Sequence, residues 1–263
     1  MSQRLDGVRP RFASLTLAAL LSSYGAAVAQ SAGGGAKIPI TTASSEARQQ
    51  YIKGRTLAEN LRAQDSREFL TRAAAADPGM TLAHYSLALS APTAKDFFQH
   101  LKQAVALAGK ASEGERLMVL GLQAGANADT KAQRDYYERL AAAYPRDERA
   151  HFLLGGAYFG QQNYSQAIGE YEESVELAPD YAPAHNLLGY AHRANGQFEE
   201  AEKAFKKYIA LIPNDPNPYD SYAELLMKMG RFDESIAMYR KALATDPHFA
   251  NSRFGIASNL MYQ

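Results

Sequence analysis

Two short glycine-containing segments are the first candidates for chemistry, because a glycine-rich loop can hold phosphate groups on its backbone amides. They are GGGAK at 33–37 and AGKAS at 108–112. Neither has the Gly-Lys-Ser/Thr ending with a further glycine five positions earlier, and neither follows a predicted strand. The segment GGAYFG at 155–160 lies inside a predicted helix, which excludes a dinucleotide-binding turn. We therefore predict no cofactor.

Three histidines are the next candidates, because imidazole binds zinc and acts as a general base. His151 and His185 occupy equivalent positions 34 residues apart, and His192 lies two helical turns after His185. Neighbouring packed helices lie about 10 Å apart, which is too far for equivalent residues to share one metal ion. No Ser/His/Asp set or carboxylate pair stands out from the repeat pattern described below. We predict no catalytic residue, no metal site and no enzyme activity.

Composition narrows the function classes further. The 263 residues carry a formal net charge of 0, so charge-driven binding to nucleic acid has no support. Hydrophobic residues make up 46% of the chain, which is enough for a folded core. The count of 0 Cys excludes disulfides and thiolate metal sites. We expect a protein that is stabilised by packing and does not bind nucleic acid.

The N-terminus has the layout of an export signal. Three arginines within the first eleven residues precede an apolar run that is shorter than the roughly 20 residues of a membrane span. The run ends in Ala-Val-Ala at 27–29, so we predict a signal peptide over 1–29 with cleavage after Ala29. The protein would be exported to a bacterial periplasm or secreted. An uncleaved anchor is the alternative and would be its only membrane contact. Residues 30–45, rich in Gly, Ser and Thr, predict a flexible linker.

An internal repeat positions everything that follows. Pro145, Pro179, Pro213 and Pro247 are each 34 residues apart, and two apolar helical runs lie between successive prolines. Proline cannot continue a helix, so each one marks the end of a unit. Each unit is predicted to be a helical hairpin that can bury its second apolar face only against the next unit.

Small and aromatic residues keep the same register in each hairpin. Gly155 and Gly189 lie at equivalent positions of the first helix, where a missing side chain lets two helices approach closely. Phe198 and Phe205 share one face of the second helix and are expected to fill the gap beneath the next unit. Gly196 follows the first helix, where a left-handed residue can satisfy the last carbonyl groups.

In this order, the Leu-Gly pairs, the aromatics, the small residues and the closing prolines resemble the tetratricopeptide repeat family. The resemblance implies an all-α, right-handed superhelical solenoid of antiparallel helix pairs. We predict three repeats over 148–249, degenerate hairpins of the same kind over 47–147, and the first helix of a further, incomplete repeat over 250–263. An unrelated helical cap is the alternative for the N-terminal half.

Two positions depart from the family pattern. The bulky residue that begins a repeat, often Trp in the family, is His151, His185 or Tyr219 here, and we interpret the histidines as packing residues. Tyr208 stands where the family has a small residue, which leaves the packing at that interface open.

The resemblance also implies that the first helices line a concave face. The protein-binding residues predicted on this basis are Phe152, Phe159, Asn186, Tyr190, Arg193, Asp220, Ser221, Glu224 and Met227. Packing against the neighbouring repeat is the alternative for the two phenylalanines. Asp220 and Glu224 oppose a clamp for acidic C-terminal tails, so we predict none. The resulting prediction is a non-catalytic adaptor or scaffold that binds a peptide or partner domain of unknown identity in its concave groove.

Two other functions are compatible with the pattern. The helix predicted at 250–263 lacks the polar outer face of a solenoid cap, so we expect the natural chain to continue. The sequence would then be the interaction module of a longer chain whose C-terminal part carries another activity. In the second alternative the protein is structural and self-associates through this end helix or through its convex face.

Overall fold

The fold consists of paired α-helices. The structure, a computed structural model, describes residues 37–262, so the predicted signal peptide and the first part of the predicted linker lie outside the described residues. Within them there is no strand, and one short 3-10 helix, η1 (Ala108–Lys110), follows α4. The α-helices are α1 (Ser45–Glu59), α2 (Ala63–Ala76), α3 (Thr81–Leu89), α4 (Ala94–Leu107), α5 (Glu113–Ala126), α6 (Thr130–Ala143), α7 (Glu148–Gly160), α8 (Tyr164–Leu177), α9 (Ala182–Ala194), α10 (Phe198–Leu211), α11 (Pro216–Lys228), α12 (Phe232–Thr245) and α13 (Ala250–Tyr262).

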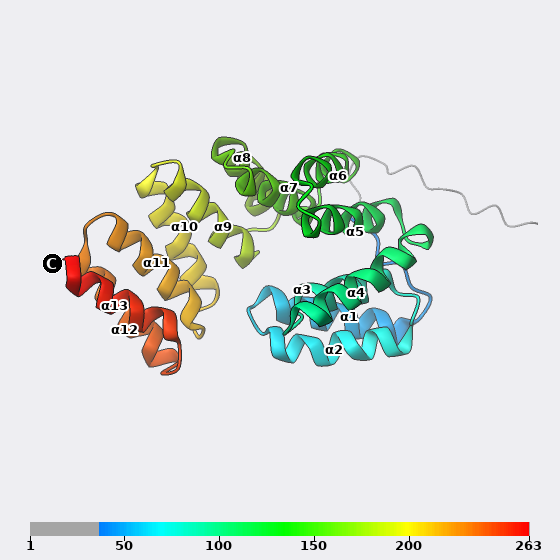
Figure 1. The fold of residues 1–263 in the computed structure, drawn as a ribbon, viewed down its shortest axis with the longest axis horizontal. Coiled ribbons are helices and arrows are strands. Elements are labelled where there is room, and N and C mark those ends of the chain that lie inside the picture. The colour runs from blue at the N-terminus through cyan, green and yellow to red at the C-terminus, as the bar shows by residue number, and fades with distance from the viewer. Residues whose placement is uncertain (1–36, 263) are drawn as a thin grey trace, which may run out of the picture. The chain divides into compact units, whose positions relative to one another are not determined.

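The helices form hairpins that stack in chain order (Figure 1). The odd-numbered helices α1 to α11 each pack against the next helix of their own hairpin, and each hairpin then contacts the one that follows. Each helix can therefore bury one side in its hairpin and another against the neighbouring pair. The predicted all-α stack of antiparallel helix pairs is confirmed for the part of the chain that the structure describes.

A glycine facing a ring sets the close approach inside each hairpin. A Cβ added at Gly155 would lie 2.7 Å from the ring of Tyr171, and one at Gly189 would lie 2.7 Å from the ring of Phe205. The aromatic residue lies 16 positions after the glycine, on the second helix of the same hairpin. These rings therefore fill a gap within their own hairpin, whereas the sequence placed them beneath the next unit.

The same spacing recurs in the first hairpin. Gly54 of α1 faces Leu70 of α2, again 16 positions later, and an added Cβ would lie 2.8 Å from the leucine. The hairpin of α1 and α2 thus closes in the way of the later ones, although Leu70 replaces the ring. The first hairpin lacks the aromatic residue of the repeat and has the same geometry.

Left-handed residues end the first helices of most hairpins. Gly196 and Gly230 have φ angles of 79° and 74°, as expected for glycines that close a helix. Leu61, Ala128 and Gln162 occupy the matching turns with φ angles of 59–62°. The turn is thus imposed by the hairpin geometry even where the residue has a side chain that disfavours it.

The bulky residue that begins each repeat ties its helix to the preceding loop. His151 Nε2 and His185 Nε2 each lie 3.0 Å from the carbonyl oxygen of the proline six residues earlier, and Tyr219 Oη donates to Pro213 at the same distance. Arg253 makes the equivalent bond to Pro247. Because a carbonyl oxygen only accepts, the two histidines carry a proton on Nε2. These residues therefore act as hydrogen-bond donors as well as packing residues.

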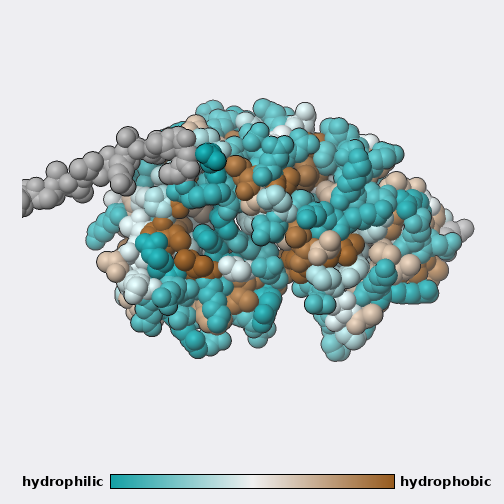
Figure 2. All heavy atoms as spheres, turned by 180° about the vertical axis from the view of Figure 1, so that it is seen from behind, coloured by the Kyte–Doolittle hydropathy of each residue, from teal (hydrophilic) through white to brown (hydrophobic). Residues whose placement is uncertain are grey.

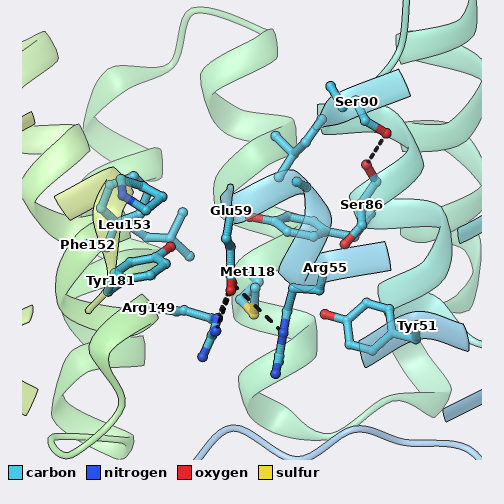
Figure 3. Close-up of a pocket in the computed structure, with 15 residues that line it drawn as sticks. Tyr51, Arg55, Glu59, Ser86, Ser90, Met118, Arg149, Phe152, Leu153 and Tyr181 are labelled. Atoms are coloured by element: carbon cyan, nitrogen blue, oxygen red, sulfur yellow. Dashed lines mark hydrogen bonds and ion pairs between the residues drawn. The ribbon is translucent and has the colours of Figure 1, made fainter. Parts of the chain in front are cut away.

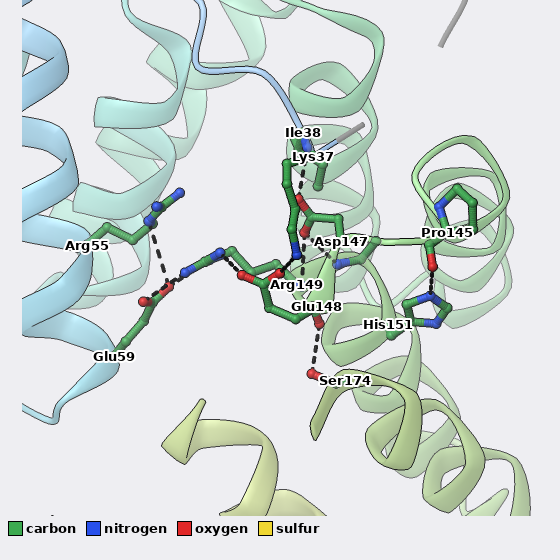
Figure 4. A network of polar contacts seen from close by, with 11 residues as sticks. Lys37, Ile38, Arg55, Glu59, Pro145, Asp147, Glu148, Arg149, His151 and Ser174 are labelled. Atoms are coloured by element: carbon green, nitrogen blue, oxygen red, sulfur yellow. Dashed lines mark hydrogen bonds and ion pairs between the residues drawn. The ribbon is translucent and has the colours of Figure 1, made fainter. Parts of the chain in front are cut away.

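Residues 37–44 form an extended strap along the N-terminal hairpins, where the sequence predicted a flexible linker (Figure 4). The amide of Ile38 donates to Asp147 Oδ2 at 2.8 Å, and that of Thr41 donates to Glu115 Oε1 at 2.8 Å. The hydroxyl of Thr42 donates to Asp77 at 2.6 Å. Ile38 and Ile40 also pack against the largest core cluster. The small and hydroxyl-rich composition concealed a segment held by its backbone amides and two isoleucines.

Tyr208 fits its interface without disruption. Its side chain is fully buried, and its hydroxyl donates to Asn217 Oδ1 at 3.1 Å. The hydrogen bond satisfies the buried hydroxyl, which explains how a large side chain replaces a small one there. Among the residues that the structure describes, no helix is long and apolar enough to cross a membrane.

Candidate functional site

The nine predicted binding residues do not converge on one site. Phe152 lines a pocket toward the N-terminal end, whereas Arg193, Glu224 and Met227 line a second pocket near the C-terminal end. The remaining five line neither. The two pockets define the candidate site.

Tyr190, Arg193, Ser221 and Glu224 form a connected polar group across α9 and α11. The hydroxyl of Tyr190 lies 3.0 Å from Ser221 Oγ and 3.2 Å from Glu224 Oε2, and Arg193 lies 2.9 Å from the same carboxylate oxygen. Burial and the nearby Glu224 carboxylate raise the pKa of Tyr190 to about 12, so its hydroxyl is a neutral donor at pH 7. The group ties two first helices together and leaves only Arg193 and Glu224 facing a pocket.

The other predicted residues are committed to packing. Asp220 and Ser221 are almost fully buried, and Ser252 of α13 donates to Asp220 at 2.6 Å. Burial raises the pKa of Asp220, so this carboxylate is held at a cost and serves to dock α13. Phe159 packs against the core cluster around Tyr171, and Asn186 is half-buried with a buried side-chain oxygen that has no hydrogen-bond partner.

The C-terminal pocket is a broad, open hollow of about 1000 Å³ between α9, α11 and α13. Its charged residues are Arg193, Glu224 and Lys228, and the side chains of Met227 and Phe254 are among its apolar walls. Phe254 is 72% exposed, so much of this surface is in contact with solvent. The mixture of charges and exposed apolar groups suits a wide contact with another protein better than a small ligand.

The N-terminal pocket is smaller and more enclosed, with a volume of about 280 Å³. Its walls come mainly from the first helices α1, α3, α5 and α7 and from the start of α9 (Figure 3). The aromatic walls are Tyr51, Tyr85, Phe152 and Tyr181, and Leu89, Met118 and Leu153 add aliphatic surface. Seen from behind, the described residues show separate hydrophobic patches within a mostly hydrophilic surface (Figure 2).

An alternating chain of charges closes one side of the N-terminal pocket. Arg149 of α7 binds Glu59 of α1 through two bonds of 2.7 and 2.9 Å, although the two residues are 90 positions apart. Arg149 also pairs with Glu148, which pairs with Lys37 of the strap (Figure 4). The ion pair therefore joins the first hairpin to the fourth across the face formed by the first helices.

Arg55 is the last member of this chain and the least satisfied. Its Nε lies 3.9 Å from Glu59 Oε1, and this buried atom has no hydrogen-bond partner. Its guanidinium lies 5.5 Å from the ring centre of Tyr51 (Figure 3). Lys37, Arg149 and Arg55 oppose only Glu148 and Glu59, so the chain carries one positive charge in excess at its pocket end.

Sequence reasoning missed the residues that build this pocket. Tyr51, Arg55 and Glu59 lie four positions apart and form a single stripe along α1. An aromatic, a cation and an anion on one helix face are a signal that the face is not simply solvated. No local pattern could pair Glu59 with Arg149, because the pair depends on how the stack curves over several hairpins.

Comparison with known families agrees with the repeat pattern. Tetratricopeptide repeat models match residues 120–182 and 157–216, and a further tetratricopeptide repeat model matches residues 217–249. Among solved structures, TTC0263 from Thermus thermophilus, described as a thermophilic TPR protein, is similar with 22% identity and a TM-score of 0.50. That match covers 82% of this chain and 99% of TTC0263.

A second solved structure shows the same fold. It is that of the APC/C hetero-tetramer Cut9–Hcn1, with 18% identity and a TM-score of 0.61 over 82% of this chain and 43% of that chain. At these identities, the two likenesses describe the arrangement of helices and not an activity. No curated protein matches the sequence.

Proposed function

The chain is a tetratricopeptide repeat protein over residues 120–249, and from that premise we propose that it is a non-catalytic adaptor that binds a peptide or partner domain on the face lined by its first helices. Tetratricopeptide repeats are generally protein-interaction modules. In such a stack the hairpins bury their faces against one another and leave the inner wall for recognition.

The N-terminal pocket is the observation that supports this proposal most directly. It lies on the face of the first helices, combines four aromatic side chains with few polar groups, and is open enough to be entered. Buried aromatic and aliphatic anchors supply most of the binding energy in protein interfaces, and they need such a pocket on the partner.

Site-specific photo-crosslinking tests the proposal. A photoreactive phenylalanine analogue at Phe152 is expected to crosslink a partner in native extract, because this residue lines the pocket. The same analogue at Lys203, which is exposed on α10, serves as the control. If position 203 captures the same partner as strongly as position 152, the pocket does not recognise that partner.

We also propose that the protein is exported to the periplasm or secreted. Support comes only from the positive, apolar and small-residue segments over 1–29, which lie outside the described residues. N-terminal sequencing of the protein from fractionated cells is expected to begin at Gln30. A cytoplasmic protein that retains its first residues would overturn this part of the proposal.

Self-association is a second candidate function, favoured by the exposed side chains of α13. Phe254, Leu260, Met261 and Tyr262 are between 61% and 85% exposed on this one helix. Exposed apolar surface of this kind is typical of an interaction site. Measurement of mass at rising concentration tests the candidate: a dimer that Leu260→Lys plus Met261→Lys dissociates supports it, whereas a monomer at high concentration rejects it.

A further inference from the structure

The N-terminal pocket joins an apolar cavity to an under-satisfied cation, and this combination points to the chemistry of a ligand. A volume of about 280 Å³ is at or below the lower end of the roughly 300–1,000 Å³ of small-molecule pockets. It therefore suits one large side chain of a peptide. The walls are aromatic and aliphatic, so the side chain that fills them is apolar.

Arg55 supplies the polar half of the recognition. Its buried Nε has lost contact with water without gaining a hydrogen bond, and the Glu59 carboxylate lies 3.9 Å away and is already held by Arg149. A guanidinium and a carboxylate can form two parallel hydrogen bonds, and such charge-assisted bonds are stronger than neutral ones. A ligand carboxylate would satisfy Arg55 and neutralise the excess positive charge.

We propose that the N-terminal pocket binds a peptide segment in which a large apolar residue is followed by an acidic residue. The apolar side chain lies against Phe152 and Tyr181, and the acidic side chain binds Arg55. The proposal rests on the proposed function of the same face and specifies which peptides it selects.

Blocked peptides provide the probe. The test peptide is Ac-Gly-Ser-Phe-Asp-Gly-Ser-NH2, and its matched controls replace Asp by Asn or Phe by Ala. Binding is followed through the methyl resonances of the 7 methionines, because Met118 lines this pocket and Met227 lines the C-terminal pocket. We expect the Phe-Asp peptide to shift the Met118 resonance and to bind at least tenfold more tightly than either control.

Two variants separate the charge of Arg55 from charge in general. Arg55→Gln is expected to remove the preference for Asp over Asn, while Arg67→Gln, the same change on α2 away from the pocket, keeps it. Circular dichroism and thermal unfolding of both variants establish that they are folded. If the Asp and Asn peptides bind equally to the unmodified protein, or if Arg55→Gln retains the preference, the proposal is wrong.

Two further outcomes would also overturn it. The first is that decanoate shifts the Met118 resonance and the peptide does not, which identifies a fatty-acid pocket. The second is that the peptides fail to bind while the photoreactive residue at position 152 captures a partner. In that case the adaptor function stands and only the ligand chemistry proposed here falls.

Discussion

Single glycines decide how closely the helices of a hairpin approach. Gly189→Ala would place a Cβ 2.7 Å from the ring of Phe205, which is fully buried and cannot move aside. We expect this variant to lose about 1–3 kcal/mol of unfolding free energy, as overpacked cores do. Thermal or denaturant unfolding measures the loss.

The matched control is Gly169 of α8, where an added Cβ meets nothing within 4 Å. Gly169→Ala is expected to raise the unfolding free energy by about 0.5–1 kcal/mol, because alanine is the better helix former. Equal effects of the two substitutions would show that ring contact is not the reason for the recurring register of small residues within this chain.

Two histidines in equivalent positions are predicted to titrate in opposite directions. His151 donates to Pro145 and also lies 2.7 Å from Glu170, and the bond to Glu170 raises its pKa above the usual 6.5. Burial lowers the pKa of His185, which has no such carboxylate. NMR titration of the ring protons is expected to place His151 above and His185 below the usual value.

Stability follows the signs of these shifts. The contribution of His151 is fully present below pH 6.5 and is lost as the pH rises through its raised pKa. The fold favours neutral His185, so that contribution is lost as the pH falls below 6.5. Removal of Glu170 should abolish the raised value of His151, and a His151 that still titrates late would contradict the assigned cause.

At the scale of the element, the left-handed turns allow a stabilising substitution. Gln162 has a φ angle of 62° and an exposed side chain, and glycine occupies the equivalent turn at 196. Gln162→Gly is expected to raise the unfolding free energy by about 1 kcal/mol, since a left-handed residue with a Cβ is strained by about that amount. The reverse change, Gly196→Gln, is expected to lower it by a similar amount.

The strap makes two equivalent helix caps different. Asp147 caps α7 and also accepts the Ile38 amide, whereas Asp215 caps α11 with a 2.9 Å bond to Asn217 and lies beyond the described strap. Alanine at either position is expected to cost about 1 kcal/mol through the lost cap. Asp147→Ala should lose a further 1 kcal/mol or so and speed hydrogen exchange at the Ile38 amide.

If both alanine variants lose the same stability and the Ile38 amide stays protected, the strap is held by its isoleucines alone. Because Asp215 is half-buried and burial raises its pKa, the comparison belongs at pH 7, where both carboxylates are ionised.

The hairpins themselves could be predicted from the sequence, and the pocket could not. A period of 34 residues with small and aromatic residues in register determines two helices and a turn through local preferences. The N-terminal pocket depends on Tyr51 and Arg55 of a hairpin that lacks most of that register, and on a pair that joins residues 59 and 149. The strap was missed because a backbone amide that finds a buried Glu115 leaves no trace in composition.

For the whole molecule, the pair between Arg149 and Glu59 adds a contact beyond nearest neighbours. Stacks of this kind are stabilised mainly by each unit and its direct neighbours, so unfolding can spread from either end. Glu59→Gln removes this link and is expected to cost about 1–3 kcal/mol, because both partners are only about one-fifth exposed.

Hydrogen exchange locates the loss. The amides of α1 should exchange faster in Glu59→Gln, while those of α10 to α12 should keep their protection, because they do not touch the first hairpin. A uniform increase along the chain would show that the stack unfolds as one cooperative unit and that the pair is no local clasp.

The strap also determines how this protein would respond to a pulling force at its N-terminus. A load applied before residue 37 reaches the contacts of Lys37, Ile38, Thr41 and Thr42 in that order, before it reaches any helix. The contacts would then break one after another, like the teeth of a zipper, at low tension. The eight residues of 37–44 would serve as a mechanical fuse that protects the helices behind them.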